Sequence, residues 1–426
     1  MDIIANQTAW KQALDILSHI RSSSGSAVLP ILNCVLIQAL DTGLTLTRTD
    51  RERQLRAPLH TDQVTGQGEV AVDARKLASL IAALPAAARV RARLSETGRL
   101  TLAATVGERT VSRFTLGTLP GCDFPLMDLA LDREREPGGA SARAADPGPA
   151  AVTGAVTAGG QGGGQAGQTP GLTARLTLPG QRLRAVLDAT SFAMAKQDVR
   201  YYLNGLLLEW HGETLLLVGT DGHRLAHVGL RAAIDGDPGQ AIVPADSVAI
   251  LARIGAETGD REVTMEVNRN RLAVAWHGCE LISKLIDGRY PEWRRVVPKH
   301  PQPAARWVLN VAETTAALHR VKILSHEKFH GVALEVREEQ PQILYLTTAN
   351  TQADEAEEAL PLEAPCAAGR WGFQIDYLLD VLSHCPVATV DIRLGDASSS
   401  ALLTPGLAGT DDDLDDPEWV IMPMLL

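Results

Sequence analysis

Three stretches of the chain repeat one another and decide the fold: CVLIQALDTGLTLTRTD at residues 34–50, GLLLEWHGETLLLVGTD at 205–221 and GVALEVREEQPQILYLTTAN at 331–350. Each consists of two apolar runs around a short polar turn, which predicts a two-stranded β-hairpin. The first two end on an aspartate, Asp50 or Asp221, and the third ends at the same place on Asn350. Hairpins that recur in this way indicate an internal repeat.

Each hairpin occupies the same place in a longer pattern. An amphipathic helix is expected before it, over residues 8–21, 181–195 and 312–325, because apolar side chains recur there at helical spacing. A strand and a second helix follow it, in VAVDARKLASLIAAL, AIVPADSVAILARIG and GFQIDYLLDVLSHC, and another hairpin closes each unit. The order predicts an α+β fold of three tandem units, each of about 120 residues.

Two insertions interrupt the repeats and set the expected boundaries. Residues 133–171 are rich in Gly, Ala and Pro, which predicts a flexible linker. An acidic stretch at about residues 405–418 predicts a solvated loop. We therefore expect units at residues 1–132, 172–299 and 300–426.

The composition bounds the class of protein. The five cysteines lack paired spacing, which fits a reducing cytoplasm, and neither a signal peptide nor a long apolar segment is evident. The net charge of −11 argues against a uniformly basic nucleic-acid-binding protein. It leaves open a basic channel inside an acidic exterior, because binding depends on where the charges lie.

A search for catalytic or metal-binding patterns indicates no enzyme, no cofactor and no metal. A formal G-x-G-x-x-G at residues 162–167 lies in the linker, away from any strand and helix, and a zinc signature is lacking. The most enzyme-like stretch is Asp221-Gly222-His223-Arg224, where His223 is the alternative candidate for a general base. The first repeat has Asp50-Arg51-Glu52-Arg53 there, so a structural turn is the preferred interpretation.

Several long motifs resemble the bacterial DNA polymerase III beta subunit family, the DNA sliding clamps. They include SFAMAKQDVRYYLNGLLLE at 191–209, VGTDGHRLA at 218–226, SKLIDGRYPEWRRVVPK at 283–299 and the terminal VIMPMLL. LPILNCVLIQA, TLPGCDFP and HEKFHGVAL also match, so the resemblance covers the chain except for the two insertions.

The resemblance implies both a fold and a function. Each chain would hold three clamp domains, and two chains would form a head-to-tail homodimeric ring, with helices lining the interior and antiparallel sheets outside. The ring would encircle double-stranded DNA without reading its sequence. It would tether the DNA polymerase III catalytic subunit, the clamp loader, and repair and other polymerases through a short hydrophobic peptide. Such a clamp is a non-catalytic cytoplasmic processivity factor that needs no membrane.

The resemblance also implies three sets of site residues. The DNA-contact residues would be Gln197, Arg200, Tyr201, Tyr202, Arg75, Lys76 and Arg253. The partner-peptide pocket would comprise Leu203, Thr220, Gly222, His223, Arg224, Leu225, Pro291, Arg295, Val296, Tyr377, Ser400, Val420, Met422, Pro423 and Met424. The dimer interface would comprise Phe114, Leu116, Ile323 and Leu324. Further helix cations expected to attract phosphate are Lys11, Arg182, Arg184, Arg320 and Lys322.

Two departures from the family pattern motivate a second interpretation. Ser26 and the pair Ala245-Asp246 stand where family members often carry basic residues. Both changes weaken the expected grip on DNA, so a specialised clamp paralogue with altered inhibitor or client binding is the alternative. The acidic loop precedes the last strand of the expected pocket, and we hypothesise that it selects clients by charge.

Overall fold

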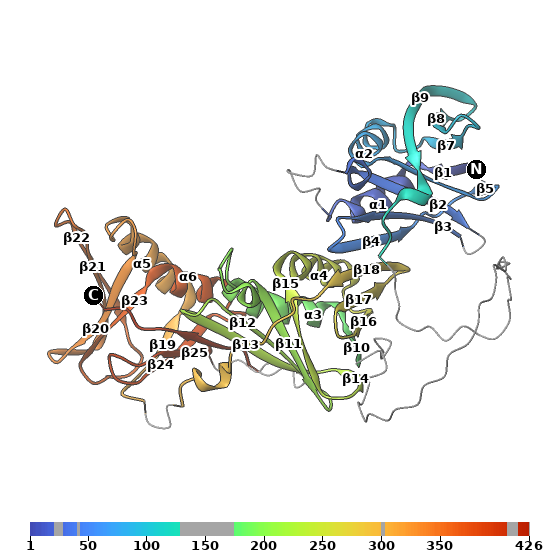
Figure 1. Ribbon diagram of the computed structural model, residues 1–426. Coiled ribbons are helices and arrows are strands. Elements are labelled where there is room, and N and C mark those ends of the chain that lie inside the picture. Colours follow the sequence, from blue (N-terminus) through green and yellow to red (C-terminus); the bar gives the residue numbers. More distant parts are fainter. Residues whose placement is uncertain (21–28, 41–42, 128–173, 300–302, 407–415, 426) are drawn as a thin grey trace, which may run out of the picture.

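A computed structural model describes residues 1–20, 29–40, 43–127, 174–299, 303–406 and 416–425. The predicted linker at 133–171, Ser26 and most of the acidic loop lie outside the described residues. The described parts form three α+β units in an arc (Figure 1). The labelled helices lie toward the concave side of the arc, and the sheets form its convex side.

The three units repeat one order of elements. The first contains β1 (Asp2–Asn6), α1 (Gln7–Leu17), β2 (Cys34–Leu40), β3 (Gly43–Thr49), β4 (Arg53–Pro58), β5 (Gln63–Thr65), β6 (Gly68–Asp73), α2 (Ala74–Ala83), β7 (Arg89–Leu94), β8 (Arg99–Val106) and β9 (Arg109–Pro120). The second contains β10 (Ala174–Pro179), α3 (Gly180–Thr190), β11 (Gly205–His211), β12 (Thr214–Thr220), β13 (Arg224–Arg231), β14 (Ala233–Gly236), β15 (Gly239–Pro244), α4 (Ala245–Thr258), β16 (Glu262–Val267), β17 (Arg271–Trp276) and β18 (Cys279–Lys284). The third contains β19 (Ala305–Asn310), α5 (Val311–Ile323), β20 (Gly331–Arg337), β21 (Gln340–Ala349), β22 (Glu355–Pro361), β23 (Gly369–Gln374), α6 (Ile375–His384), β24 (Thr389–Leu394), β25 (Ala401–Pro405) and β26 (Glu418–Ile421). Short 3-10 helices η1 to η5 span Pro30–Asn33, Gly121–Asp123, Ser191–Ala193, Tyr201–Leu203 and Trp293–Arg295.

The leading helices end earlier than their apolar spacing predicts. Helix α3 was expected to reach residue 195, but it ends at Thr190 and the 3-10 helix η3 follows. The apolar residues Ala193, Met194 and Ala195 are buried all the same, in a segment that is not α-helical. Burial alone therefore produced the helix-like pattern beyond Thr190.

The sheets run continuously from one unit to the next. Strand β4 of the first unit pairs antiparallel with β18 of the second, and β13 of the second pairs antiparallel with β26 of the third. The first junction thereby joins a sheet of 14 strands, and the second joins a sheet of 8 strands. A sheet of 4 strands, β22-β21-β20-β23, completes the third unit.

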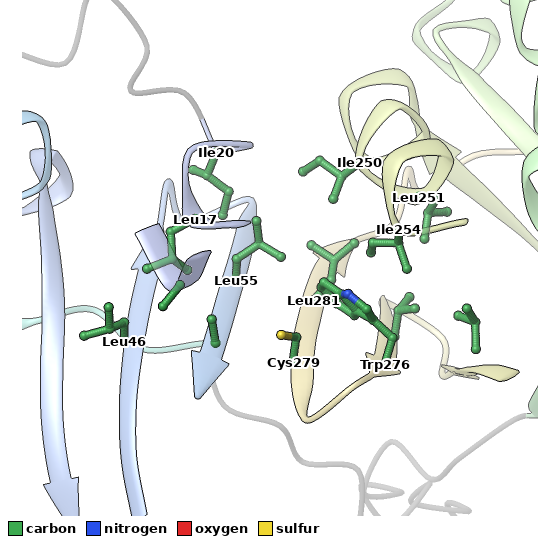
Figure 2. Close-up of a cluster of buried hydrophobic side chains, with 14 of the residues drawn as sticks. Leu17, Ile20, Leu46, Leu55, Ile250, Leu251, Ile254, Trp276, Cys279 and Leu281 are labelled. Atoms are coloured by element: carbon green, nitrogen blue, oxygen red, sulfur yellow. The ribbon is translucent and has the colours of Figure 1, made fainter. Parts of the chain in front are cut away.

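The core extends across the first junction as well. Ile20 and Leu55 of the first unit face Ile250 and Leu281 of the second (Figure 2), and all four are buried. Burying such side chains contributes roughly 1.5–3 kcal/mol each. The junction is therefore held by an apolar core as well as by strand pairing.

Candidate functional site

A tight turn connects β12 to β13 at the second junction. The Thr220 hydroxyl donates to the Arg224 carbonyl at 2.6 Å, and the Asp221 carboxylate accepts from the backbone N–H groups of His223 and Arg224 at 2.9 and 3.0 Å. Gly222 has a φ of +91°, which favours glycine. The turn from Thr49 to Arg53 in the first unit has the same hydrogen bonds. Because both turns share this pattern, the role of Asp221 is to hold the turn. Its hydrogen bonds go to the backbone and do not bring a second catalytic group to His223.

Arg224 is the buried centre of this site, with 8% of its surface exposed. Its guanidinium pairs with Asp221 at 3.1 Å and with Asp380 of α6, and it donates to the Phe192 carbonyl at 2.9 Å. It also lies 4.7 Å from the centre of the Tyr377 ring. Arg224 therefore joins the second and third units and is engaged within the chain.

The C-terminal tail crosses the turn. Leu225 pairs with Val420 across β13 and β26, and the Met422 N–H then donates to the His223 carbonyl at 2.9 Å. The Ser400 hydroxyl lies 3.0 Å from the Met422 sulfur, and the Met424 N–H reaches the Gly372 carbonyl at 2.7 Å. Met422, Pro423 and Met424 remain partly exposed, so the tail offers adaptable apolar surface.

An apolar cluster lies beside the tail. Leu203, Leu225 and Val420 are at most 3% exposed and pack in one cluster with Tyr290 and Trp293. Pro291, Arg295 and Val296 lie on the same segment as Trp293 and are exposed. The predicted pocket residues thus divide into a buried apolar floor and an exposed rim.

The sequence prediction missed several residues of this site. Asp380 and Phe192 hold Arg224, and Trp293 packs in the apolar cluster. Phe192 and Trp293 lie inside the motifs quoted above, so their position in those motifs could have assigned them to the site. Asp380 is 156 residues from Arg224, and no local pattern connects the two.

The loop expected to approach DNA lies against the same turn. The Arg200 guanidinium donates to the Asp198 carboxylate and, at 3.0 Å, to the Asp221 carbonyl. The hydrogen bond from the Arg200 side chain lowers the pKa of Asp198 to about 2. Gln197 has a φ of +57°, and Tyr201 is 57% exposed while Tyr202 is half-buried. Tyr201 is therefore the tyrosine that the loop presents to solvent.

The predicted helix cations differ in how far they are engaged. Arg75, Lys76 and Arg253 are exposed and make no ion pair within the described residues. Arg184, Arg320 and Lys322 instead pair with Asp188, Glu358 and Asp376. These three were expected to face phosphate freely, and the intrachain pairs reduce that contribution.

The predicted interface residues lie at opposite ends of the arc. Phe114 and Leu116 are half-buried on β9, and Ile323 at the end of α5 is 79% exposed beside the half-buried Leu324. Among the described strands, residues 109–117 of β9 pair with β8 alone, and β22 pairs with β21 alone. Each end of the arc therefore presents a strand edge with unpaired backbone groups.

No group of three or more His, Cys, Asp or Glu side chains is placed to hold a metal ion within the described part of the chain. None of the helices that the structure describes is long and apolar enough to cross a membrane.

Three sequence profiles match the chain. They are the N-terminal, central and C-terminal domains of the DNA polymerase III beta subunit, matched by residues 11–128, 177–292 and 294–424. The chain is 33% identical to the beta sliding clamp of Escherichia coli strain K12 over 407 residues, with 94% of each chain covered. It is 34% identical to that of Pseudomonas aeruginosa over 399 residues, with 93% of each covered.

Solved structures agree with the profiles. A crystal structure of the DNA polymerase sliding clamp from Pseudomonas aeruginosa with ligand has a TM-score of 0.81 at 32% identity and covers 100% of both chains. A second Pseudomonas aeruginosa clamp structure, bound to griselimycin, has a TM-score of 0.80 at 32% identity and again covers 100% of both chains. Caulobacter crescentus pol III beta has a TM-score of 0.79 at 26% identity and the same coverage.

Proposed function

Because the chain belongs to the DNA polymerase III beta subunit family, the bacterial sliding clamps, we propose that two copies close into a ring around duplex DNA. Members of this family are non-catalytic processivity factors of DNA replication. Each chain would contribute three domains, at residues 1–132, 172–299 and 300–426. The ring of two chains would therefore contain six domains. The ring would act in the bacterial cytoplasm, where it would tether the replicative polymerase to its template.

The complementary ends of the arc carry this proposal. Strand β9 has a free edge bearing Arg109 and Arg113, and β22 has a free edge bearing Glu355 and Glu357. Antiparallel pairing of β9 with the partner's β22 would satisfy both edges and bring opposite charges together. Because each chain has one end of each kind, the contact is head to tail, and two such contacts close a ring.

Apolar side chains support the same contact. Ile323 is 79% exposed beside the β22 edge, and Phe114 and Leu116 lie on β9. Association that covers these side chains would remove apolar surface from water. We therefore assign Phe114, Leu116, Ile323 and Leu324 to the dimer interface.

The concave surface would hold the DNA. Arg75, Lys76 and Arg253 are exposed helix cations, and Gln197, Arg200, Tyr201 and Tyr202 would add contacts from the loop before β11. A few dispersed cations attract phosphate without fixing a register, which suits sliding.

The tail site would bind client proteins. A short hydrophobic peptide of the polymerase catalytic subunit, the clamp loader or a repair polymerase would cover the floor of Leu203, Leu225 and Val420. His223, Tyr377, Met422 and the exposed rim at Pro291, Arg295 and Val296 would surround it. Arg224 would orient the turn rather than bind the peptide, because its guanidinium is engaged with Asp221 and Asp380.

One observation favours the second candidate, a specialised clamp with a weaker DNA grip. Asp246 in the first turn of α4 pairs with Arg53 at 2.9 Å and is still 77% exposed at its side chain. An exposed carboxylate there reduces attraction for phosphate. Complementation of a resident clamp would distinguish a specialised copy from a housekeeping one.

The test is retention on DNA after loading by a clamp loader. We expect the protein to stay on a singly nicked circle and to leave the same DNA once it is linearised, because only a closed ring is topologically linked. Ile323→Glu should abolish retention on circles by opening the interface, whereas the matched change at an exposed position outside both the interface and the DNA-contact loop, Leu40→Glu, should leave the ring closed. Equal retention on circular and linear DNA would refute the ring mechanism.

A further inference from the structure

Strand β7 carries an arginine at every second position. Arg89, Arg91 and Arg93 have 58%, 54% and 69% of their side chains exposed, while Val90 and Ala92 between them are buried. Successive side chains of a strand point to opposite faces. The three arginines therefore form one row on the face of the sheet that points away from the core.

Strands β8 and β9 widen this row into a surface. Arg91 pairs with Ala103 of β8, which in turn pairs with Arg113 of β9, so Arg113 lies two strands from Arg91 on the same face. Arg99, at the start of β8, lies two residues before Thr101, the partner of Arg93, and so on the same face. The name arginine face is used here for the outward surface that carries Arg89, Arg91, Arg93, Arg99 and Arg113.

The arginine face has a shallow floor between the β7 row and Arg113. Thr101 and Ala103 of β8 lie between the two, and both side chains are short. Two strand spacings separate the β7 row from Arg113 by about 10 Å, and the β7 row is about 13 Å long. The surface is thus a trough with the β7 row on one side and Arg113 on the other.

The charge of this region opposes that of the whole chain. Residues 89–113 contain six arginines and two glutamates, in a chain of net charge −11. Asp62 pairs with Arg89 at 2.9 Å, and Asp2 pairs with Arg91 at 2.5 Å and Arg93 at 3.7 Å. Within the described residues Arg99 and Arg113 make no ion pair. Arg99 is therefore a cation that no carboxylate of the described chain neutralises, whereas Arg113 would face the acidic β22 edge of the partner in the proposed ring.

The repeats show that the fold does not require these arginines. The strands β7, β16 and β24 hold the same place, because each pairs with the first strand of its unit. At the three outward positions of β16 the chain has Glu262, Thr264 and Glu266, and at those of β24 it has Thr389, Asp391 and Arg393. The arginine row is thus a property of the surface of the first unit alone.

The chemistry of the trough favours a phosphate backbone over a protein. Protein partners gain most of their affinity from large side chains seated in apolar pockets, and a floor of alanine and threonine provides none. Arginine forks and threonine hydroxyls both donate hydrogen bonds to phosphate oxygens. The outward positions of β7, β8 and β9 hold no aromatic residue on which a base could stack.

We propose that the arginine face binds the backbone of single-stranded nucleic acid on the outside of the molecule, without sequence preference. One extended backbone fits along the β7 row, over Thr101 and Ala103, with Arg99 at one end. The choice of DNA as ligand rests on the proposed function, since a clamp at a replication fork meets single-stranded template. The binding itself needs no ring closure.

The experiment measures fluorescence anisotropy of a labelled oligothymidylate with the full chain, between about 50 and 200 mM salt. The variant Arg89→Gln/Arg91→Gln/Arg93→Gln should bind about tenfold more weakly, and its salt slope should fall by about 2, because each lost phosphate contact removes about 0.7. Arg89→Lys/Arg91→Lys/Arg93→Lys should keep most of the affinity, which separates loss of charge from misfolding.

A matched control removes the same charge elsewhere. Arg175→Gln/Arg269→Gln/Arg370→Gln changes three exposed arginines of the other two units and should leave the affinity within about twofold. Unchanged binding by the β7 glutamine variant would overturn the proposal. So would equal displacement of the oligonucleotide by a polyglutamate peptide of the same charge, which would assign the face to an acidic protein segment.

The oligonucleotide-binding experiment can succeed or fail independently of the test for ring closure. The β7 glutamine variant should still be retained on nicked circles, because its substitutions lie away from the β9 edge and α5. If retention on circles fails for the unmodified protein while oligonucleotide binding persists, the ring is refuted and the arginine face stands.

Discussion

The two unit junctions share one backbone design and differ in chemistry. At the first, the Lys284 N–H donates to the Glu52 carbonyl at 2.9 Å, and at the second the Met422 N–H donates to the His223 carbonyl at the same distance. The side chains at the first pair as ions, with Lys284 Nζ 2.9 Å from Glu52. At the second they are a thioether and an imidazole stacked on Tyr377. At this position the first junction carries an ion pair, while the second carries partly exposed apolar surface.

The next residue of each strand continues the contrast. Gln54 follows Arg53 at the first junction, and its side-chain oxygen accepts from the Met127 N–H at 2.8 Å. Leu225 follows Arg224 at the second, and it packs in the apolar cluster with Trp293 and Val420. Strand pairing thus fixes the geometry of both junctions, and a few side chains decide that only one of them suits a hydrophobic peptide.

The largest effect is expected from giving the second junction the ion pair of the first. His223→Glu/Met422→Lys should weaken binding of a hydrophobic client peptide by about 100-fold or more, because two central contacts become charged and must be desolvated. Isothermal titration calorimetry with the synthetic peptide measures this.

The reciprocal change is the control for that prediction. Glu52→His/Lys284→Met alters the first junction and should leave the peptide affinity unchanged. Equal losses in the two variants would mean that the peptide does not bind at the second junction.

A smaller effect is expected from removing the arginine of each turn. Arg224→Ala should cost about 2–3 kcal/mol of unfolding free energy, since it leaves Asp221 without its partner and removes the link to Asp380. We discount the full cost of breaking a buried pair because the Asp380 side chain is 46% exposed. Arg53→Ala should cost less, about 1–2 kcal/mol. It also leaves Asp50 without its partner, but the second partner that it loses, Asp246, is 77% exposed.

Hydrogen exchange of the junction strands resolves the two sites in a protein of several units. Arg224→Ala should speed exchange in β13 and β26, and Arg53→Ala should speed it less in β4 and β18. Equal acceleration at both junctions would contradict the proposed difference in burial.

A third effect comes from the turn backbone. A Cβ at Gly222 would meet Arg200 Nη1 at 2.9 Å, and the φ of +91° adds strain, so Gly222→Ala should cost about 1–2 kcal/mol. The equivalent Arg51 has a φ of +73°, and Arg51→Gly should stabilise the first turn by up to about 1 kcal/mol. Urea unfolding of both variants gives the sign of each change in unfolding free energy. If Arg51→Gly is destabilised, the contacts of the Arg51 side chain contribute more to stability than its backbone strain costs.

Sequence alone predicted much of this architecture, because its signals are local. The three hairpins, the order of elements and the equivalence of Asp50 with Asp221 all follow from apolar period and turn residues. The family resemblance placed His223, Leu225 and Met422 in one site, and the structure brings them together.

The remaining features depend on pairings between distant residues. The contact of Arg224 with Asp380 joins residues far apart in sequence, so no periodicity reports it. The alternation in RVRARL was visible, but only the register of β7, β8 and β9 places Arg113 beside that row. The end of α3 at Thr190 was missed for a different reason, since buried residues continue into a segment that is not α-helical.

The smallest expected effect concerns a cross-strand pair at the far end of each junction. Arg56 faces Glu280 at 3.6 Å in the first, and His227 faces Glu418 at 2.9 Å in the second. The hydrogen bond from His227 lowers the pKa of Glu418 below its usual 4.5 despite partial burial. A carboxyl with a lowered pKa stabilises the fold above its unfolded pKa, and this contribution is lost as the pH falls through the folded pKa.

Acid should therefore weaken the second junction through Glu418, by less than about 1 kcal/mol because its side chain is 36% exposed. Carbon-13 NMR titration of the Glu418 carboxyl measures the shift directly. In His227→Ala the pKa should rise toward 4.5, since the main cause of its lowering is removed. An unchanged pKa in that variant would assign the lowering to Arg393, the remaining cation near Glu418, and would make the pair at the second junction independent of His227.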